Sequence, residues 1–327
     1  MRTLNGSSER VVLDVAGASV GGAARFLGEL DAWLARDPSR GERVAVVGRG
    51  RRLTPGWLVI RETAAARGAR RIALNNASFW APSGERVVLL RNALHFASQE
   101  EFDALGFVAS RELKAQVPII HSLARRADLI VVPCQAMADR VARHARGLRK
   151  RIVVRGHPVS SPSWAGQGSA GRLSILVPVV PAPYKNLDRH VVALLEATRG
   201  LNARVLLTAT PAQVPLVAER DRIEFLGLMS AAQLLPYWRE ARAIYYPTAL
   251  EAFGYPLAEA RVGGRWIVAQ DTDQNREIAG PALAPYSSGD LASLSEAVDS
   301  AFGSDDPVPN PAPNDPDAYF EWLTRGP

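Results

Sequence analysis

The stretch Glu251-Ala-Phe-Gly-Tyr-Pro-Leu-Ala-Glu259 follows an apolar run and decides how the second half of the chain is organised. The apolar run predicts a strand, the residues around Gly254 a loop, and Pro256 the first position of a helix. Proline is tolerated at that position, and glycine lets the backbone approach a ligand closely. Glu251 then lies on the loop and Glu259 in the first helical turn. The pattern predicts two carboxylates beside one helix N-terminus.

Two carboxylates at a helix N-terminus suit a nucleoside diphosphate-sugar. Helix N–H groups and the positive end of the helix dipole bind phosphate, and carboxylates accept hydrogen bonds from pairs of sugar hydroxyls. The alternative is a helix start whose acidic residues only complement the dipole. The stretch alone favours that alternative, and the surrounding sequence reverses the preference.

The segment from Ile223 to Ala279 resembles the donor-binding half of family-4 glycosyltransferases. The matching elements stand in that family's order and spacing and are Glu224-Phe-Leu-Gly227, Leu234–Ala241, Tyr246-Pro-Thr248, Glu251–Glu259, Gly264, Ile267-Val268 and Glu277-Ile-Ala-Gly280. The resemblance implies a GT-B fold, an α/β architecture in which two Rossmann-like domains face each other across a cleft. It also implies retaining transfer of a sugar from an activated nucleotide.

The resemblance assigns roles to the residues of the opening stretch. In that family the first Glu contacts the transferred sugar, which makes Glu251 a candidate catalytic and donor-binding residue. The second Glu binds the ribose, which implies that role for Glu259. The loop between them meets the phosphates, so the implied donor contacts are Ala252, Phe253, Gly254, Tyr255 and Pro256.

Lys185 follows a predicted strand and precedes a predicted helix. A cation at a helix N-terminus is unfavourable, so a bound anion is the economical explanation, and a solvated lysine is the alternative. The family carries a Lys at this point that meets the donor diphosphate and stabilises the departing charge. Lys185 is therefore a second candidate catalytic and donor-binding residue.

The chain departs from the family's pattern at two places. Pro178-Val-Val-Pro181 stands where the family has an Arg before that Lys, so either Arg25 or Arg155 supplies the charge or activity is weak. Gly264-Arg265-Trp266 replaces the usual Gly-Thr-Pro after the second Glu.

The loop after the first predicted strand allows two interpretations. Gly21 and Gly22 open a helix and, with Arg25 shortly after, resemble the family's first loop, which closes over the donor phosphates. Alternatively, Gly17-Ala-Ser19-Val-Gly21 fits the nucleophile elbow of serine hydrolases. Its position on the first strand disfavours the elbow, which normally follows several earlier strands.

Residues of the first half resemble the acceptor half of a subset of the same family, through Gly56–Glu62, Asn75-Asn76 and Val87–Phe96. Asn92 and His95 follow a buried strand at the edge where open parallel sheets bind ligands. Both are candidate acceptor-binding residues, and His95 is a third candidate catalytic residue. A hydrogen-bonded loop histidine is the alternative.

Short apolar runs alternate with helical segments through 327 residues, which predicts parallel sheets with crossover helices in two domains. Residues 1–157 are expected to form the acceptor domain with six strands, near Val11–Val15, Val44–Val47, Ile72–Asn75, Val87–Arg91, Leu129–Val132 and Ile152–Val154. Residues 173–304 are expected to form the donor domain, with strands near Ser174–Val177, Val205–Thr208, Ile223–Phe225, Ala243–Tyr246 and Trp266–Ala269. Residues 158–172 are rich in Gly, Ser and Pro and predict a linker. Residues at about 315–327 resemble the family's terminal helix, which packs back on the first domain.

Composition indicates a cytoplasmic globular protein, with 47% hydrophobic residues, no apolar run long enough to span a membrane, and one cysteine, Cys134. The polar N-terminus predicts no signal peptide. A net charge of +6, concentrated in arginines of the first half, suggests an anionic partner. The inner face of a membrane and a diphosphate donor both satisfy the charge, and a solvated arginine-rich surface without a partner is the favoured alternative. No nucleic-acid motif accompanies it, so nucleic acid is not expected.

The sequence therefore predicts a retaining glycosyltransferase that uses a nucleoside diphosphate-sugar donor and a glycan, lipid-linked or small-molecule acceptor. No metal or other cofactor is expected, because Asp271-Thr-Asp273 favours a polar turn over a metal site. The alternative is a non-catalytic nucleotide-sugar-binding or scaffold protein, which the missing Arg favours. The sequence does not identify the transferred sugar, the nucleotide base of the donor or the acceptor.

Overall fold

The computed structural model describes residues 10–66, 69–169, 173–217 and 221–326. The start of the predicted first domain, the last three positions of the predicted linker and the final residue lie outside this part. The chain forms two compact units. The first unit is Met1–Phe96, Ala109–Pro158 and Asp315–Pro327, and the second is Ala97–Val108 and Val159–Asn314.

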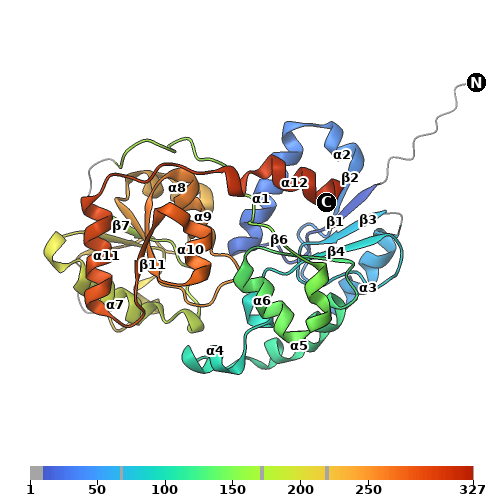
Figure 1. Cartoon of the computed structure of the whole chain (residues 1–327), viewed down its shortest axis with the longest axis horizontal. Coiled ribbons are helices and arrows are strands. Elements are labelled where there is room, and N and C mark those ends of the chain that lie inside the picture. Colours follow the sequence, from blue (N-terminus) through green and yellow to red (C-terminus); the bar gives the residue numbers. More distant parts are fainter. Residues whose placement is uncertain (1–9, 67–68, 170–172, 218–220, 327) are drawn as a thin grey trace, which may run out of the picture. The chain divides into compact units, whose positions relative to one another are not determined.

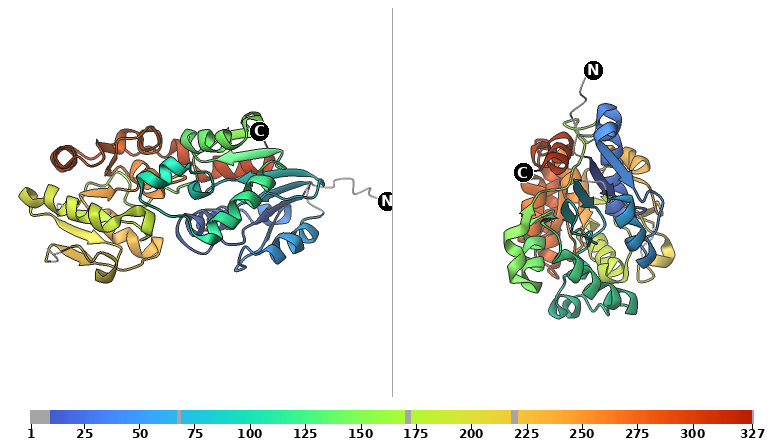
Figure 2. Two further views of the ribbon diagram at one scale, coloured as in Figure 1. Left: turned by 90° about the horizontal axis from the view of Figure 1, so that it is seen from below. Right: turned by 90° about the vertical axis from the view of Figure 1, so that its right-hand side faces the viewer.

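The first unit is built on a six-stranded sheet with the order β2-β1-β3-β4-β5-β6. All pairings are parallel, and the strands are β1 (Val11–Asp14), β2 (Val44–Val47), β3 (Arg70–Ala73), β4 (Glu85–Leu89), β5 (Leu129–Val132) and β6 (Ile152–Val154). Helices cover both faces of the sheet (Figure 2), so most strand residues are buried and most of the strands are largely apolar.

Helices of the first unit include the C-terminal one. They are α1 (Gly21–Arg36), α2 (Ser39–Arg43), α3 (Pro55–Ala64), α5 (Arg111–Ala124), α6 (Gln135–His144) and α12 (Pro316–Arg325), with 3-10 turns η1 (Ala93–His95) and η2 (Arg146–Arg151). Figure 1 shows α12 beside α1. The ring of Phe320 on α12 lies 5.4 Å from that of Phe26 on α1, so aromatic packing holds the end of the chain on the first unit.

The second unit has a six-stranded parallel sheet with the order β12-β11-β10-β7-β8-β9. Its strands are β7 (Ser174–Val177), β8 (Arg204–Leu207), β9 (Ile223–Phe225), β10 (Ala243–Tyr246), β11 (Trp266–Gln270) and β12 (Leu283–Tyr286). Its helices are α4 (Gln99–Ala104), α7 (Leu187–Ala197), α8 (Ala231–Glu240), α9 (Tyr255–Gly263), α10 (Asp273–Ala279) and α11 (Leu291–Gly303), with 3-10 turns η3 (Pro183–Lys185), η4 (Arg199–Leu201), η5 (Pro211–Gln213), η6 (Gly280–Ala282) and η7 (Ala312–Asn314).

Each sheet has one point where the direction of the strand order reverses. In the first sheet the chain adds β2 on one side of β1 and β3 on the other, and in the second it adds β8 on one side of β7 and β10 on the other. The loops that follow the two central strands diverge at such a point, and open parallel sheets bind ligands there. We call these the first switch point (β1/β3) and the second switch point (β7/β10).

The predicted α/β class with two parallel sheets is confirmed. Residues 158–169 of the segment predicted as a linker form no helix or strand, and from Val159 onward they group with the second unit. The buried ring of Trp164 stacks on Trp238 at 6.2 Å, and a Cβ on Gly263 would lie 2.2 Å from Trp164 Cη2. Close packing therefore takes the place of a loose connection there.

Residues Ala97–Val108, which the sequence analysis placed in the first domain, group with the second unit. Ser98 forms a capping box with Glu101 and starts α4. After the helix, the Phe107 ring lies 5.6 Å from Tyr184, and Asn186 Nδ2 donates to Leu105 O at 3.1 Å. The segment Ala97–Val108 therefore packs against the turn that carries Lys185 and supports it.

Candidate functional site

Gly254 connects β10 to α9 and has a left-handed backbone with φ of +82°. A Cβ at this position would lie 2.9 Å from Leu257 Cδ1 and 3.1 Å from Tyr246 Cε1. The glycine is therefore explained by its backbone conformation and by close protein contacts, without a ligand. Pro256 is the second residue of α9, not the first as predicted. Glu259 is the fifth residue, so it lies just past the first turn in which it was expected.

The loop before α9 is well packed. Ala252, Phe253 and Tyr255 are 4–7% exposed, so these predicted donor contacts have backbone atoms to offer and little side-chain surface. Gln274 Nε2 on α10 donates to Glu251 O at 3.1 Å. Gln270 Nε2, at the end of β11, donates to Pro247 O at 3.0 Å. Sequence reasoning missed both glutamines, although they flank the Asp-Thr-Asp stretch it considered.

That Asp-Thr-Asp stretch forms a helix start. Thr272 caps α10 by accepting a hydrogen bond from Asn275 N at 3.1 Å, and Asp271 forms an ion pair with Arg276 at 2.6 Å. Among the described residues, no group of His, Cys, Asp and Glu has the arrangement of a metal site.

Lys185 and Glu251 meet at the second switch point. Lys185 Nζ lies 2.8 Å from Glu251 Oε1, and their side chains are 10% and 22% exposed. The two residues are far apart in sequence and meet because β7 and β10 are adjacent parallel strands, paired through Ile175 and Ala243. The anion that the sequence analysis required near Lys185 is thus supplied by a protein carboxylate.

Two tyrosines surround the Glu251 carboxylate, and sequence reasoning missed both. Burial, with a smaller contribution from the Glu251 charge, raises the pKa of Tyr184 and of Tyr246. The Tyr246 hydroxyl is hydrogen-bonded to Glu251. Because the Tyr246 phenol stays protonated at neutral pH, it donates to the carboxylate and keeps it oriented as an acceptor.

An open groove of about 460 Å³ adjoins this region in the second unit. Its walls are the turn Pro181–Pro183, the first turn of α7, and η5 with Leu216. Asp188 in that first turn accepts hydrogen bonds from Leu216 N at 3.0 and 3.1 Å, so its carboxylate holds one wall in place.

Asn92 and His95 lie together on η1 in the first unit. Asn92 Oδ1 caps the turn by accepting from Leu94 N at 3.1 Å, and its Nδ2 lies 3.4 Å from His95 Nε2. His95 is 6% exposed, and its Nε2 also lies 3.3 Å from Gln116 Oε1. Burial lowers the pKa of His95, which keeps the imidazole neutral at pH 7.

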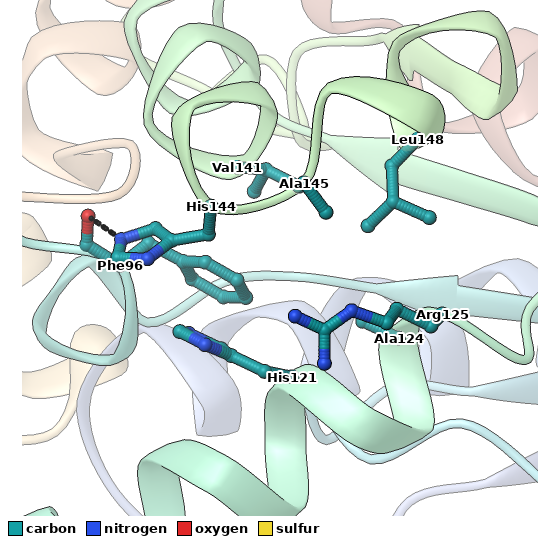
Figure 3. Close-up of a pocket in the computed structure, with 8 residues that line it drawn as sticks. All are labelled: Phe96, His121, Ala124, Arg125, Val141, His144, Ala145 and Leu148. Atoms are coloured by element: carbon teal, nitrogen blue, oxygen red, sulfur yellow. Dashed lines mark hydrogen bonds between the residues drawn. The ribbon is translucent and has the colours of Figure 1, made fainter.

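Figure 3 shows a small pocket of the first unit next to Phe96, the residue after His95, in which the rings of Phe96 and His121 stack with centroids 4.9 Å apart. His121 Nε2 lies 2.7 Å from His95 O, and His144 Nε2 lies 3.1 Å from Phe96 O. Burial, and to a lesser degree the charge of Arg125, lowers the pKa of His121. His121 therefore holds the backbone of the predicted acceptor residue His95, and His144 holds that of Phe96, which follows it.

Gly21 and Gly22 start α1 on the exposed surface of the first unit. Gly21 has φ of +56°, and α1 has no side-chain hydrogen bond at its N-cap, Val20. The nucleophile-elbow interpretation of Ser19 fails, because a loop separates the end of β1 at Asp14 from α1, and Ser19 is not among the residues with a strained positive φ. The first loop remains a candidate phosphate contact.

Arg155, one of the two proposed replacements for the missing Arg, is engaged within the first unit. Its NH2 donates to Ala318 O at 2.8 Å, and its guanidinium lies 4.8 Å from the centre of the Trp322 ring. Arg155 therefore contributes to holding α12.

Comparisons with known proteins identify the fold. No model of a known protein family matches the chain, and no curated protein matches its sequence. Among solved structures, WaaG, a glycosyltransferase involved in lipopolysaccharide biosynthesis, has a TM-score of 0.64 at 13% identity over 96% of this chain and 94% of its own. Anabaena HepE in complex with UDP-glucose has a TM-score of 0.63 at 16% identity over 96% and 95%.

Sucrose-phosphate synthase from Thermosynechococcus elongatus has a TM-score of 0.64 at 13% identity, over 97% of this chain and 94% of its own. The match to TarM covers 78% of this chain but only 51% of that larger one. The fold is GT-B, as predicted. Within the described ranges, no helix has the length and apolar character needed to span a membrane.

Proposed function

We propose that the chain is a retaining glycosyltransferase, similar to family 4, that transfers a sugar from a nucleoside diphosphate-sugar to an acceptor hydroxyl. The observation that carries the proposal is the contact of Lys185 Nζ with Glu251 Oε1 at 2.8 Å, at the switch point of the second sheet of a GT-B fold. HepE, which has the same fold, has been crystallised with UDP-glucose.

Lys185 would bind the donor diphosphate and stabilise the charge that develops on it as the glycosidic bond breaks. An ammonium has three donors, so Lys185 can keep Glu251 while it binds phosphate oxygens. Glu251, held by Tyr246 and Lys185, would accept hydrogen bonds from hydroxyls of the transferred sugar, and Glu259 would hold the ribose.

Retention in this scheme needs no enzymic nucleophile, because the leaving phosphate itself takes the proton of the acceptor hydroxyl. The N–H groups of Gly21 and Gly22 would add phosphate contacts, and Asn92 and His95 would position the acceptor. Neutral His95 can donate or accept one hydrogen bond but carries no charge to the site. No metal is required.

A second candidate function is a non-catalytic nucleotide-sugar-binding protein. Pro178-Val-Val-Pro181 lacks the expected Arg, and Arg155 is bound to α12. Lys185 would then anchor a diphosphate without turnover.

Two measurements test the proposal. In a thermal-shift panel of nucleotides and nucleotide sugars, a ligand that binds only the folded state raises the Tm, and at equal concentration a tighter ligand raises it more. The stabilising nucleotide sugar is then incubated with the wild type and with Glu251→Gln, and free sugar is quantified. A transferase hydrolyses the donor slowly and loses this activity with Glu251→Gln. Binding without hydrolysis selects the binding protein, and the absence of any shift rejects both.

A further inference from the structure

Helix α3 turns its aromatic and charged residues inward and its aliphatic residues outward. Trp57 and Arg61 are 7% and 1% exposed, whereas Val59 and Ile60 are 59% and 58% exposed. Surface helices normally show the reverse arrangement. The exposed positions Gly56, Val59, Ile60 and Thr63 have the spacing of one helix face, and that face carries no charge.

The inward face of α3 is explained by the first switch point. Asp14 is buried at the end of β1 and requires donors, which Trp57 Nε1 supplies at 3.0 Å and Arg61 NH1 at 2.8 Å. The outward face has no such explanation, because an exposed valine or isoleucine gains nothing from folding.

Further apolar and basic side chains adjoin this face. Trp80 is 47% exposed, and its backbone N–H donates to Glu62 Oε1 on α3 at 2.9 Å, which fixes it beside the helix. Leu53, 37% exposed, precedes α3 and follows the exposed Arg51 and Arg52. We call these residues the α3 patch: Arg51, Arg52, Leu53, Val59, Ile60 and Trp80. Figure 1 shows α3 at the periphery of the first unit.

The charged members of the α3 patch, Arg51 and Arg52, are both basic. Arg51 and Arg52 form no ion pair within the described part of the chain. Glu62, the carboxylate nearest in sequence to the exposed face, has a side chain only 9% exposed and is paired with Arg71 at 3.3 Å. The patch therefore offers aliphatic side chains, an indole and two arginines to a partner, with no competing exposed acid on the helix.

We propose that the α3 patch docks the protein on an anionic phospholipid surface. Aliphatic side chains of an amphipathic helix enter the boundary between headgroups and acyl chains, a tryptophan favours the headgroup level, and arginines bind anionic headgroups. A second copy of the chain fits less well. A two-fold contact would pair the patch with itself and bring two sets of arginines together. The net charge of +6 adds a general attraction to an anionic surface.

Co-sedimentation of the full chain with vesicles tests this proposal. Vesicles of equal parts phosphatidylglycerol and phosphatidylcholine should bind the protein at low salt and release most of it at high salt, whereas phosphatidylcholine alone should not bind it. Ile60→Glu should weaken partition about tenfold or more through lost apolar burial. The double variant Arg51→Glu/Arg52→Glu should weaken it about 25-fold or more, at about fivefold for each lost arginine.

Matched controls keep the result specific. Ile119→Glu changes an aliphatic residue on α5 that is 49% exposed, and Arg149→Glu changes an exposed arginine on η2. Both should bind vesicles nearly as the wild type does. The Tm of every variant shows whether it is folded, and only folded variants are compared.

Several outcomes would overturn the proposal. These are wild-type binding by Ile60→Glu, equal binding to neutral and anionic vesicles, or equal losses in the controls. If the wild type ignores vesicles but sediments as a dimer that Ile60→Glu dissociates, the patch is an interface between copies. None of these results depends on donor hydrolysis, so docking and transferase activity can fail separately.

Discussion

The two switch points use the same position in the fold for an ion pair, but they bury it differently. At the first, Asp14 is 0% exposed and is bound by Arg61, which is 1% exposed, and by Asn75 Nδ2 at 2.9 Å and Trp57 Nε1 at 3.0 Å. At the second, Lys185 and Glu251 are 10% and 22% exposed. One carboxylate is enclosed by protein donors, and the other is partly open to solvent.

This difference teaches which pair can exchange its partner for a ligand. Removing a hydrogen-bond donor from a fully buried carboxylate costs several kcal/mol of folding free energy. The Asp14 cluster therefore stabilises the fold and is not available to a ligand. The Lys185–Glu251 pair keeps some exposure to solvent, so phosphate oxygens or sugar hydroxyls can reach it without displacing buried protein donors. A switch point is therefore a position where a ligand site can form. The solvent exposure of its charged side chains decides whether a ligand can reach them.

Asp14→Asn should have the largest effect on stability. The substitution keeps the shape but leaves the buried Arg61 guanidinium without its counter-charge, which costs about 3–5 kcal/mol. The free energy of unfolding from urea titration measures the loss. Asp31→Asn, in the exposed Arg49–Asp31 pair, is the matched control and should cost about 0–1 kcal/mol. Equal losses for the two variants would show that closure of the first switch point does not matter.

Glu251→Gln and Glu259→Gln should separate two roles within the second unit. A contact that strengthens as the glycosidic bond breaks lowers the barrier, so Glu251→Gln should cut kcat about 100-fold with a modest change in donor KM. Glu259→Gln should raise donor KM about tenfold with kcat retained. Steady-state kinetics gives both parameters. If both variants keep wild-type kinetics but have a lowered Tm, the two residues only stabilise the start of the helix and take no part in donor binding or catalysis.

Lys185→Ala should weaken binding of a nucleoside diphosphate by about 1.5–3 kcal/mol, because a charged hydrogen bond is lost, and leave nucleoside binding nearly unchanged. Calorimetry on both ligands measures the difference, and Lys114→Ala, exposed on α5, is the control. The loss of unfolding free energy should be smaller than for Asp14→Asn, because Glu251 keeps some contact with solvent when its partner is removed. An equal loss for nucleoside and diphosphate would remove Lys185 from the phosphate site.

Most strands were predictable because buried parallel strands are continuous apolar runs. Val44–Val47, Leu129–Val132 and Ala243–Tyr246 have the predicted bounds. The strand Leu283–Tyr286 was missed because its Pro285 reads as a breaker. As the last strand of the sheet it tolerates a proline, since an edge strand has one unpaired side.

The start of β3 was missed for a different reason. Arg70 and Arg71 are charged, so the prediction began at Ile72, but in the structure Arg70 pairs with Glu85 and Arg71 with Glu62, and both arginines are buried. Ion pairs allow these arginines to be buried in a strand. The partners lie elsewhere in the sequence, so the local pattern of residues does not reveal them.

The candidate site was predictable in its members but not in their contacts. Lys185 and Glu251 follow recognisable strands, yet their meeting depends on β7 lying beside β10, which only the strand order determines. Tyr184 and Tyr246 read as ordinary apolar residues of a turn and a strand. Their roles follow from a carboxylate that the fold brings to them.

The smallest predicted effect is a difference in acid sensitivity between the two units. Burial is the largest cause that lowers the pKa of His95, His121 and His157 in the first unit and of His190 in the second, and the Arg91 charge also lowers that of His157. The unfolded chain then binds more protons than the native one once the pH falls below the ordinary value of 6.5, so stability rises with pH in that range and is lost as pH falls. With three of these four groups, the first unit should lose more protection between about pH 7 and pH 5.5, before most carboxylates titrate.

Hydrogen exchange resolved by segment at the two pH values measures each unit. His121→Gln should reduce the loss in the first unit. Equal loss of protection in both units would show that the buried histidines do not set the acid response.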